Sequence, residues 1–340
     1  MNAPLRPFFG KRAPILSVKD LRVTFRVRRG LFKPEAVLTA VDGVSFELRP
    51  GETLGLVGES GSGKSTLGRA ILRLLPRTTG RVTWLGQDLA HLTPEALRRL
   101  RADMQIVFQD PLASLDPRMT VGEIVAEPLR TFQPDLPKAE VRSRVVGMLT
   151  RVGLGPEHLD RYPHEFSGGQ CQRIGIARAM INRPKLVVCD EPVSALDVSI
   201  QAQIINLLMK LQREDGLALI FISHNLSVVR HISHRIMVLY LGRVAELAER
   251  RALFREPRHP YTQALISAVP LPDPELERAR RHLVLKGELP SPLAPPSGCA
   301  FRTRCPKATS ICAAERPILE ATEDGHMVAC HHWREWSRAT

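Results

Sequence analysis

The sequence predicts an α/β fold with a mostly parallel sheet and a small C-terminal appendage. Short apolar segments typical of buried strands alternate with helical segments through residues 16–250. Hydrophobic residues make up 44% and charged residues 24% of the chain, the balance of a folded protein. Beyond about residue 250 this periodicity fades, and eleven of the 27 prolines lie there. The last quarter of the chain is therefore predicted to be compact and rich in loops.

The predicted elements follow from local patterns. Residues 16–28 alternate apolar and polar side chains, which is the period of a half-buried strand, and the turn signal at 49–51 ends the next strand. Pro76 and Pro184 are expected to end helices, because proline cannot continue the helical hydrogen-bond ladder. The predicted strands are 16–28, 40–48, 53–57, 185–189 and 217–222. The predicted helices are 64–75, 94–101, 136–152, about 168–182 and about 199–213.

Length and composition exclude several classes of protein. The 340 residues make about two domains at roughly 150 residues each. No apolar run approaches the roughly 18–20 residues that cross a bilayer, and the first residues lack the apolar core of a signal peptide. Six cysteines in a chain of this length do not make a disulfide framework. We therefore expect a protein of the reducing cytoplasm without membrane spans of its own.

Positive charge is concentrated at the start of the chain. Lys and Arg number 48 against 35 Asp and Glu, a formal net charge of +13. Residues 1–33 contain nine Lys or Arg and one acid, which accounts for +8 of that charge. Such a run attracts nucleic acid, anionic lipid or nucleotide phosphates, or it simply forms a solvated face. Charge alone does not identify the partner.

Residues 58–66 fit the phosphate-binding pattern G-x-x-x-x-G-K-[ST], between a predicted strand and a predicted helix. Glycines let the backbone turn tightly enough to aim several N–H groups at phosphate oxygens, and the helix N-terminus adds partial positive charge. Lys64 is placed to reach the β- and γ-phosphates of a nucleotide, and Ser65 to bind Mg²⁺. The predicted P-loop consists of Gly58, Ser60, Gly61, Ser62, Gly63, Lys64, Ser65 and Thr66.

Two further segments carry polar groups suited to nucleotide chemistry. An apolar strand ends in Asp190 and Glu191, where Asp190 would hold Mg²⁺ through a water and Glu191 would polarise the attacking water. The segment S-G-G-Q at 167–170 precedes a helix and makes a second anion site. One nucleotide does not need two such sites on one subunit. The duplication therefore indicates that a second subunit completes the pocket.

The order and spacing of these motifs resemble the ATP-binding cassette of ABC transporters over about residues 16–250. S-A-L-D at 194–197 and S-H at 223–224 complete the set. The resemblance implies a P-loop ATPase with a RecA-like core and a helical subdomain that bears the signature. It also implies that two cassettes pair head to tail, each P-loop facing the partner's signature. The residues that would serve the partner's ATP are Ser167, Gly168, Gly169 and Gln170.

The same resemblance implies roles for residues that no local pattern identifies. Gln109 would be a Mg²⁺ ligand linked to the membrane partner, His224 would contact the γ-phosphate, and Asp197 would lie at the dimer interface. Phe25 is expected to stack on adenine, with Phe32 as a competitor.

Two positions depart from the usual family pattern. Cys171 follows the signature where Arg or Gln is common, and Asn225 follows His224 where Asp is common. Neither change removes a phosphate contact, so we expect an active ATPase. The two cysteines outside the tail, Cys171 and Cys189, are expected to be small packing residues.

The rest of the chain resembles the ATP-binding subunits of dipeptide, oligopeptide, nickel and glutathione importers. H-P-Y-T-Q-A-L at 259–265, A-V-D-G-V-S-F at 40–46 and the insertion at 29–33 carry this resemblance. It implies ATP hydrolysis that drives uptake of peptides or a related small solute, by a peripheral protein at the cytoplasmic face of the membrane. The implied partners are two transmembrane permease subunits, a solute-binding protein and a second cassette, a paralogue rather than a second copy.

Four cysteines lie close together in the tail with spacing C-x5-C-x6-C-x17-C, namely Cys299, Cys305, Cys312 and Cys330. Four thiols in a reducing compartment favour metal over disulfides. The spacing lacks the paired C-x-x-C of common zinc ribbons and differs from the ferredoxin runs. Family members with this pattern can carry a [4Fe–4S] cluster, so the resemblance favours that cluster over Zn²⁺. Four unligated thiols are the remaining alternative.

These observations predict a basic tail at 1–15, a cassette at 16–250 and a C-terminal region with the four-cysteine site at 251–340. A nucleic-acid-associated ABC ATPase of repair or translation is the rival class, and the positive charge would suit it. Such proteins usually carry two cassettes in one chain or a long coiled-coil insertion. This chain has one cassette, so we expect no nucleic-acid partner.

Overall fold

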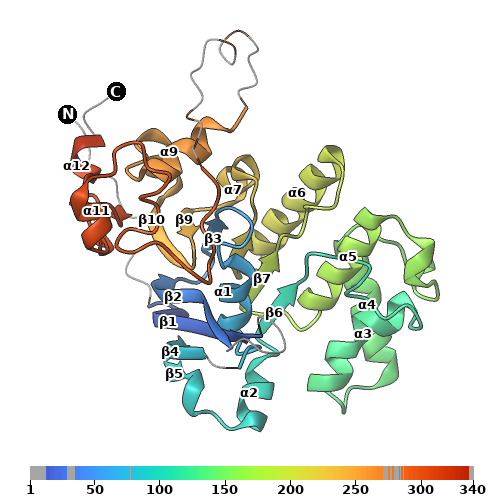
Figure 1. Cartoon of the computed structure of the whole chain (residues 1–340). Coiled ribbons are helices and arrows are strands. Elements are labelled where there is room, and N and C mark those ends of the chain that lie inside the picture. Colours follow the sequence, from blue (N-terminus) through green and yellow to red (C-terminus); the bar gives the residue numbers. More distant parts are fainter. Residues whose placement is uncertain are drawn as a thin grey trace. The chain divides into compact units, whose positions relative to one another are not determined.

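A computed structural model describes residues 13–28, 35–76, 78–270, 275, 278, 283, 285 and 287–336 (Figure 1). It contains two compact units, each built from separate parts of the chain. In the described residues, unit one comprises 13–17, 47–53 and 82–222, and unit two comprises 18–46, 54–81 and 223–336. The basic segment at 1–12 and the insertion at 29–33, with Phe32, lie outside the described residues.

Unit one is built around three parallel strands, β6 (Met104–Val107), β7 (Leu186–Asp190) and β8 (Ala218–Ile222), with β7 between the other two. Every residue of β7 and β8 is buried, as expected of strands covered on both faces. The predictions for β7 and β8 are confirmed to within one residue. Because β7 lies between β6 and β8, its C-terminal end, where Asp190 lies, is in the middle of this three-stranded sheet.

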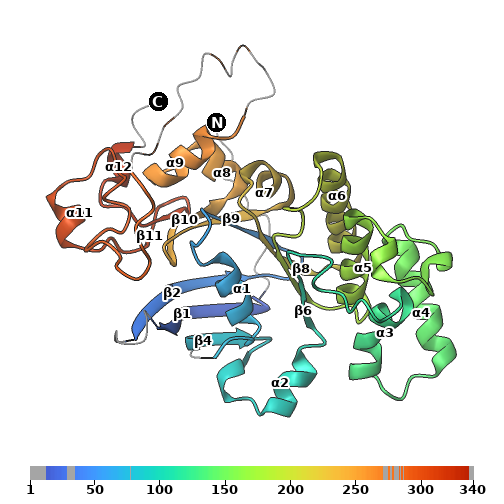
Figure 2. The ribbon, with the colours of Figure 1, turned by 45° about the vertical axis from the view of Figure 1, so that its right-hand side comes forward.

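A helical cluster of unit one is formed by α3 (Val121–Phe132), α4 (Lys138–Arg151) and α5 (Gly168–Met180), which pack on one another (Figures 1 and 2). The prediction that residues 136–152 and 168–182 form helices is confirmed. Helix α3 was not predicted, because Pro128 lies inside it and interrupts the sequence pattern. Its start is nevertheless well determined, since Thr120 and Glu123 form a reciprocal capping box.

Unit two contains a mixed sheet in which β9 (Arg235–Tyr240) lies between two other strands. β3 (Thr53–Val57) pairs parallel with β9, and β10 (Arg243–Glu249) pairs antiparallel with it. The C-terminal strands β12 (Met327–Val328) and β11 (Glu320–Ala321) continue the sheet beyond β10, both antiparallel. Residues 320–328, far along the chain from β10, therefore extend this sheet.

The remaining elements complete the two units. Strands β1 (Leu16–Val27) and β2 (Ala36–Leu48) are neighbours, and the predicted strand at 16–28 is confirmed. The smaller elements are β4 (Thr78–Trp84), β5 (Gln87–Asp88), α2 (Pro94–Leu100), α6 (Val198–Asp215), α7 (Leu226–Ile232), α8 (Arg250–Arg255), α9 (Pro260–Ser267), α11 (Ser310–Ala314) and α12 (Trp333–Trp336). Among the helices that the structure describes, none is both long and apolar enough to span a bilayer.

Helix α1 (Lys64–Ile71) ends earlier than the predicted 64–75. The chain leaves the helix at Arg73, whose φ of 54° is left-handed. The N–H groups of Arg73 and Leu74 donate to carbonyls of the last turn, at 3.0 Å each. Such a left-handed exit satisfies the final helical carbonyls. The helix therefore ends here through its own backbone geometry, before Pro76 is reached.

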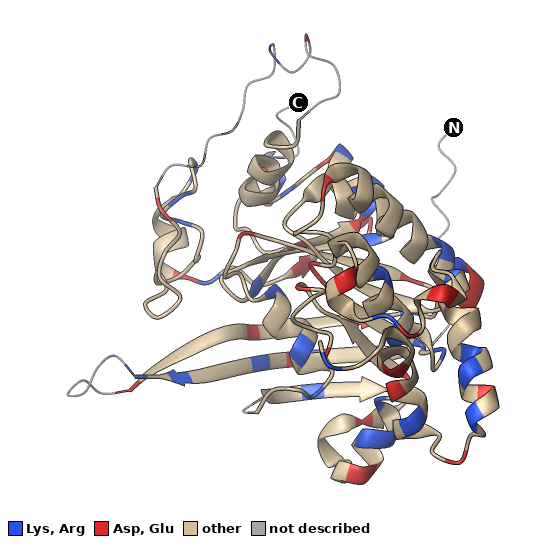
Figure 3. Ribbon diagram, turned by 90° about the vertical axis from the view of Figure 1, so that its right-hand side faces the viewer, with Lys and Arg blue, Asp and Glu red and all other residues tan. Residues whose placement is uncertain are grey.

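One buried carboxylate joins distant segments of unit two. Asp42 of β2 pairs with Arg22 of β1, with Arg243 of β10 and with Arg316 of the C-terminal region. Burial acts to raise the pKa of Asp42, but the hydrogen bond and charge of Arg243, with the charges of Arg316 and Arg22, hold it below its ordinary value. Elsewhere Figure 3 shows blue and red positions interspersed over the described helices and strands.

Candidate nucleotide site

The P-loop of unit two connects β3 to α1, and glycine is required at two of its positions. Gly58 and Gly63 have φ angles of 152° and 98°, which other residues rarely adopt. A Cβ atom on Gly58 would lie 2.2 Å from the carbonyl oxygen of Leu239, and one on Gly63 would lie 2.2 Å from that of Ala40. The loop is therefore seated against two neighbouring backbone segments, and its glycines make that close approach possible.

Hydrogen bonds within the loop converge on Glu59. The Lys64 ammonium group donates to the carbonyl oxygens of Gly58 and Glu59, at 2.8 and 3.0 Å. The Ser62 N–H donates to the same Glu59 carbonyl at 3.1 Å. The Ser62 hydroxyl is buried and has no hydrogen-bond partner among the described residues. The loop is thus held by its own hydrogen bonds and retains a buried hydroxyl without a partner among the described residues.

His224 lies beside the P-loop in unit two. Together with Gly58, it lines a cavity of about 300 Å³ that is also bounded by Asn225 and Leu265. Asn225 is the N-cap of α7, and its side chain accepts the N–H groups of Ser227 and Val228 at 3.0 and 3.4 Å. The uncommon residue after His224 therefore has a structural role, because asparagine is among the best N-cap residues.

The acid pair of unit one is placed at the C-terminal end of β7. Asp190 is 1% exposed, and Glu191 follows it with a left-handed φ of 47°. The Gln109 amide donates to the Glu191 carboxylate at 3.3 Å, and the Ser194 hydroxyl donates to the Glu191 carbonyl at 3.1 Å. A non-glycine residue with positive φ is uncommon and occurs often at functional sites. The structure thus brings Gln109 and Glu191 together.

The segment 167–170 forms the start of α5. Ser167 is the N-cap: its hydroxyl accepts the Gln170 N–H at 3.3 Å, and the Gln170 side chain accepts the Ser167 N–H at 3.0 Å. A Cβ on Gly169 would lie 2.6 Å from a side-chain carbon of Ile200, so glycine permits the close approach of α6. Asp197 is the N-cap residue of α6, without a side-chain cap bond.

The structure also shows the positions of the two cysteines outside the tail and of Phe25, the residue expected to stack on adenine. Cys171 and Cys189 are fully buried and free, as expected of packing residues. Burial, with the nearby Asp190 charge, raises the pKa of the Cys189 thiol to about 12. Phe25 is half-buried on β1, while its competitor Phe32 lies outside the described part of the chain.

Two residues from beyond the cassette contact the P-loop, and the sequence patterns did not identify either contact. The Glu59 N–H donates to the Tyr261 hydroxyl at 2.8 Å. The Arg304 guanidinium donates to both carboxylate oxygens of Glu59, at 2.7 and 3.0 Å. Tyr261 belongs to the H-P-Y-T-Q-A-L motif. The sequence identifies this motif only by its resemblance to the family and does not indicate what its residues contact. Arg304 precedes Cys305, and no spacing rule relates it to residue 59.

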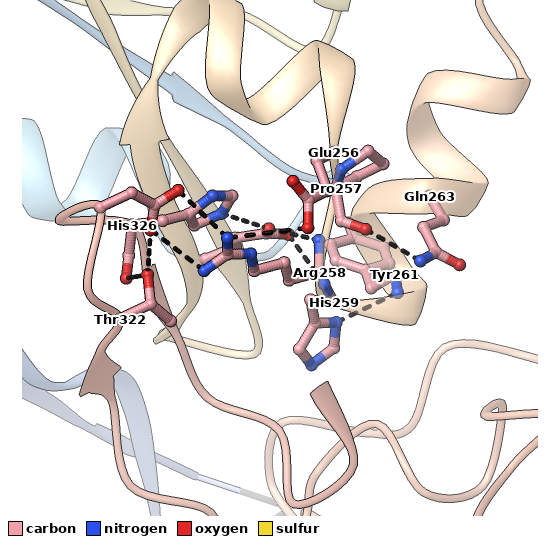
Figure 4. A network of polar contacts seen from close by, with 10 residues as sticks. Glu256, Pro257, Arg258, His259, Tyr261, Gln263, Thr322 and His326 are labelled. Atoms are coloured by element: carbon pink, nitrogen blue, oxygen red, sulfur yellow. Dashed lines mark hydrogen bonds and ion pairs between the residues drawn. The ribbon is translucent and has the colours of Figure 1, made fainter. Parts of the chain in front are cut away.

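A buried polar network positions the start of α9, which carries Tyr261 (Figure 4). The fully buried Glu246 carboxylate accepts the N–H groups of Arg258 and His259, at 2.6 and 3.0 Å, and pairs with His326. Burial lowers the pKa of His259 to about 4, so its ring stays neutral and accepts the Tyr261 N–H at 3.1 Å. Arg258 also pairs with Asp324, from the same C-terminal segment as His326.

The four tail cysteines all belong to unit two and are free thiols. Burial, together with the charges of the other three thiols, raises the pKa of Cys330 to about 12. Burial likewise raises the pKa of Cys299 and Cys305, and Cys312 acts on both. The four thiols therefore lie within electrostatic range of one another. Yet no three His, Cys, Asp or Glu side chains in the described residues are close enough to hold a metal ion.

Comparison with known proteins gives concordant matches along the chain. The family model described as ABC transporter matches residues 41–194, and that described as Oligopeptide/dipeptide transporter, C-terminal region, matches residues 245–312. The oligopeptide transport ATP-binding protein OppF of Salmonella typhimurium is 58% identical over 333 residues, covering 97% of this chain and 98% of the relative. OppF of Escherichia coli is 58% identical over 322 residues, covering 94% and 96%.

Solved structures give the same picture of the fold. The dimeric structure of MJ0796, a bacterial ABC transporter cassette, superposes with a TM-score of 0.62 at 31% identity, covering 69% of this chain and 99% of that chain. CbiO1 of Clostridium perfringens, part of the ABC transporter complex cbiONQ, superposes with a TM-score of 0.61 at 28% identity, covering 72% and 91%. These matches confirm the predicted α/β ABC-cassette fold, and they leave the C-terminal appendage as a prediction.

Proposed function

Because the chain belongs to the family of ABC transporter ATPases that carry the oligopeptide/dipeptide-transporter C-terminal region, we propose that it hydrolyses ATP to drive oligopeptide import. The observation that carries this proposal is the 58% identity to OppF of Salmonella typhimurium over 97% of the chain. The fold class, the motif order and the tail all agree with it. Within the chain, we assign the cassette to residues 16–250 and the C-terminal region to 251–340.

The P-loop geometry fits nucleotide binding, so we assign it the phosphates of ATP. Backbone N–H groups and the Lys64 ammonium group would hold the β- and γ-phosphates, and the unsatisfied Ser62 hydroxyl could take up a polar partner there. Bound Mg²⁺ would neutralise developing phosphate charge. Its ligands would be Ser65 and Gln109 directly and Asp190 through water.

The hydrolytic step is assigned to the residues at the end of β7 and to His224. Glu191 would accept a proton from the attacking water as the general base, and Gln109 orients its carboxylate by the 3.3 Å hydrogen bond. His224, which shares a cavity with Gly58, would donate a hydrogen bond to the γ-phosphate. Oriented groups of this kind stabilise charge without reorganising during the reaction.

We propose that the ATP site is completed by a second cassette, with a paralogue favoured over a second copy of this chain. The N-terminus of α5, with Ser167, Gly168, Gly169 and Gln170, would bind the γ-phosphate held by the partner. Next to Asp197, Val198 is 82% exposed, so its side chain is accessible for a contact with the partner cassette. ATP would favour the closed dimer because both surfaces bind its phosphates, and hydrolysis would remove that preference.

The membrane partners proposed are two permease subunits, supplied with solute by a solute-binding protein. Phe108 and Leu112, on either side of Gln109 and Asp110, are 36% and 53% exposed. Apolar side chains exposed beside Gln109 offer a contact through which closure of the cassettes would reach the permeases. The protein would then lie at the cytoplasmic face of the membrane as a peripheral subunit.

The function is tested by co-expressing the chain with candidate permease subunits, a solute-binding protein and a paralogous cassette. Purified complexes reconstituted in vesicles should take up oligopeptides only when ATP is present on the cassette side. The Lys64→Ala variant should assemble but lose uptake, since its phosphate contact is gone. Uptake that persists without ATP, or a complex that moves no peptide, would overturn the proposed function.

A second proposal concerns the tail: Cys299, Cys305, Cys312 and Cys330 would hold a [4Fe–4S] cluster, with Zn²⁺ as the alternative. Four free thiols that influence one another electrostatically support a shared ligand, and a bound metal would deprotonate thiols that burial otherwise keeps neutral. A single zinc ion needs its four ligands about 2.3 Å from one centre. No group of three such side chains in the described residues is placed to hold a metal ion, so the preference for the cluster rests on the family resemblance.

We expect anaerobically purified protein to be brown and to contain about four irons per chain. Its absorption at roughly 400 nm should be that of an iron–thiolate cluster. Cys305→Ser should abolish the colour, because it removes one of four ligands. Cys171→Ser, which alters a buried cysteine of unit one, should keep the iron content of the parent protein. Colourless protein with one zinc per chain would replace the cluster by zinc, and metal-free protein with four reactive thiols would contradict both.

A further inference from the structure

We propose that Tyr261 and Arg304 are positioning residues of the P-loop, and that through them the C-terminal region sets the affinity for nucleotide. We call this pair the Glu59 clamp. The inference rests on the proposed assignment of ATP to the P-loop. It extends that assignment, because it gives the region after the cassette a defined part in nucleotide binding.

The first half of the clamp holds the loop backbone. The Tyr261 hydroxyl accepts the Glu59 N–H at 2.8 Å, and the tyrosine is fully buried. Its ring packs edge-on against Tyr240 and lies 5.6 Å from Phe301, centre to centre. Tyr240 and Phe301 also contact each other, with centroids 5.3 Å apart. A hydroxyl mounted on such an aromatic cluster has little freedom, so it fixes where the Glu59 N–H points.

The second half of the clamp, Arg304, holds the side chain of Glu59. Arg304 makes a bidentate pair with Glu59, and the arginine side chain is 9% exposed. A bidentate arginine–carboxylate pair is both charge-assisted and geometrically specific. Because the pair is largely screened from solvent, it resists weakening by salt more than a surface pair would. Arg304 lies in the four-cysteine segment, directly before Cys305.

The Tyr261 half of the clamp is itself anchored by a buried network at the start of α9, where Figure 4 shows Arg258, His259 and His326. Glu246 fixes the backbone at Arg258 and His259, and neutral His259 caps the helix that carries Tyr261. The Gln263 side chain, one turn into the same helix, donates to the Pro257 carbonyl at 2.9 Å. This gives H-P-Y-T-Q-A-L a physical role: histidine caps the helix, proline starts it, tyrosine holds the loop, and glutamine closes the turn before it.

The clamp acts on the residue that organises the whole loop. The Glu59 carbonyl accepts from both Ser62 N–H and Lys64, while its N–H and carboxylate are held by the clamp. Every polar group of Glu59 is therefore engaged. A loop held in its binding conformation before the ligand arrives loses less conformational entropy on binding. Nucleotide affinity should accordingly depend on Tyr261 and Arg304, although neither touches the phosphates in this assignment.

Coupling of this kind is reciprocal. If a folded C-terminal region tightens nucleotide binding, bound nucleotide must stabilise that region by the same factor. ATP should therefore slow hydrogen exchange of backbone amides in residues 298–306, which lie outside the P-loop. A residue that merely supports the overall fold would not produce this nucleotide-dependent signal.

The test uses four full-length variants: Arg304→Gln, Arg304→Lys, Tyr261→Phe and the matched control Arg302→Gln. Arg302 lies two residues from Arg304, and its side chain donates to the carbonyl oxygen and the hydroxyl of Ser297 in its own segment. Binding of Mg²⁺-ATP is measured by titration, steady-state hydrolysis gives KM and kcat, and hydrogen exchange is followed with and without ATP. Lys64→Ala serves as the reference for lost nucleotide binding.

We expect Arg304→Gln to weaken ATP binding by about 5- to 100-fold, the usual range of coupling between sites. KM should rise while kcat at saturating ATP changes little, and the ATP effect on exchange at 298–306 should disappear. Arg304→Lys should recover part of the affinity because the charge remains, and Arg302→Gln should match the parent protein. Tyr261→Phe should weaken binding without unfolding the chain, since the ring is kept.

Failure of this inference and failure of the proposed function give different results. If the parent protein binds ATP and Lys64→Ala does not, but Arg304→Gln and Tyr261→Phe bind as tightly as the parent, the clamp is wrong and the nucleotide assignment stands. If the parent protein itself does not bind ATP, the proposed function fails. Equal weakening by Arg302→Gln and Arg304→Gln would also overturn the clamp, because the effect would then belong to the segment and not to the ion pair.

Discussion

The Glu191→Gln variant is expected to bind Mg²⁺-ATP like the parent protein and to hydrolyse it about 10²- to 10⁴-fold more slowly, the usual effect of removing a positioned general base. The amide keeps the shape of the side chain and can still bond to Gln109, so the site should remain assembled. ATP would then persist in the closed dimer. Single-turnover hydrolysis, with size-exclusion chromatography in ATP, measures both effects.

A matched acid tests whether the loss is specific. Glu95→Gln removes a carboxylate from an exposed position of α2 and should leave hydrolysis within about twofold of the parent, as for most surface substitutions. Near-normal turnover in Glu191→Gln would assign the general base to another group. Loss of ATP binding in the same variant would instead indicate that Glu191 holds the site together.

The second large effect is expected from Gly63→Ala. A Cβ at this position would lie 2.2 Å from the Ala40 carbonyl oxygen, and the residue has a φ of 98°. The left-handed conformation costs an alanine about 1–2 kcal/mol, and relieving the clash adds about 1–3 kcal/mol. At about 1.4 kcal/mol per tenfold, the combined cost of about 2–5 kcal/mol predicts that ATP affinity falls by about 30-fold to a few thousandfold, which isothermal titration measures.

The Gly86→Ala variant measures the cost of the left-handed backbone conformation without the cost of a clash. Gly86 has a similar φ of 84°, but a Cβ there would meet nothing within 4 Å. We expect this variant to lose about 1 kcal/mol of unfolding free energy, from strain alone, and to bind ATP normally. If Gly63→Ala bound ATP as tightly as Gly86→Ala, the close seating of the P-loop on Ala40 would have no part in nucleotide binding.

Local sequence patterns predicted the elements whose signals are contiguous. The buried strands β7 and β8 were recognised from short apolar runs, and the P-loop from nine consecutive residues. Helix α3 was missed because Pro128 breaks its periodicity, although the Thr120–Glu123 capping box marks its start. The sequence predicts that helix α1 continues to Pro76. In the structure the left-handed conformation of Arg73 ends the helix earlier.

Contacts between distant segments lay beyond those patterns. The Arg304–Glu59 pair joins residues 245 positions apart, and nothing in either neighbourhood indicates the other. The same holds for Asp42 with Arg316, 274 positions apart. Such pairs depend on how strands and loops are assembled, which single-sequence periodicity does not encode. The motif at 259–265 could be recognised as a signature, but its role became visible only when Tyr261 was seen to meet Glu59.

The buried Glu246 carboxylate sets a limit on shortening this protein. It lies on β10 with none of its surface exposed, and its partner His326 comes from eighty residues further along the chain. A minimal cassette that stopped near residue 250 would keep the acid and discard its partner. Leaving one member of a buried pair alone costs about 3–5 kcal/mol, a large share of a domain's stability. An engineer who wanted that minimal cassette would need to replace Glu246 by an apolar residue first.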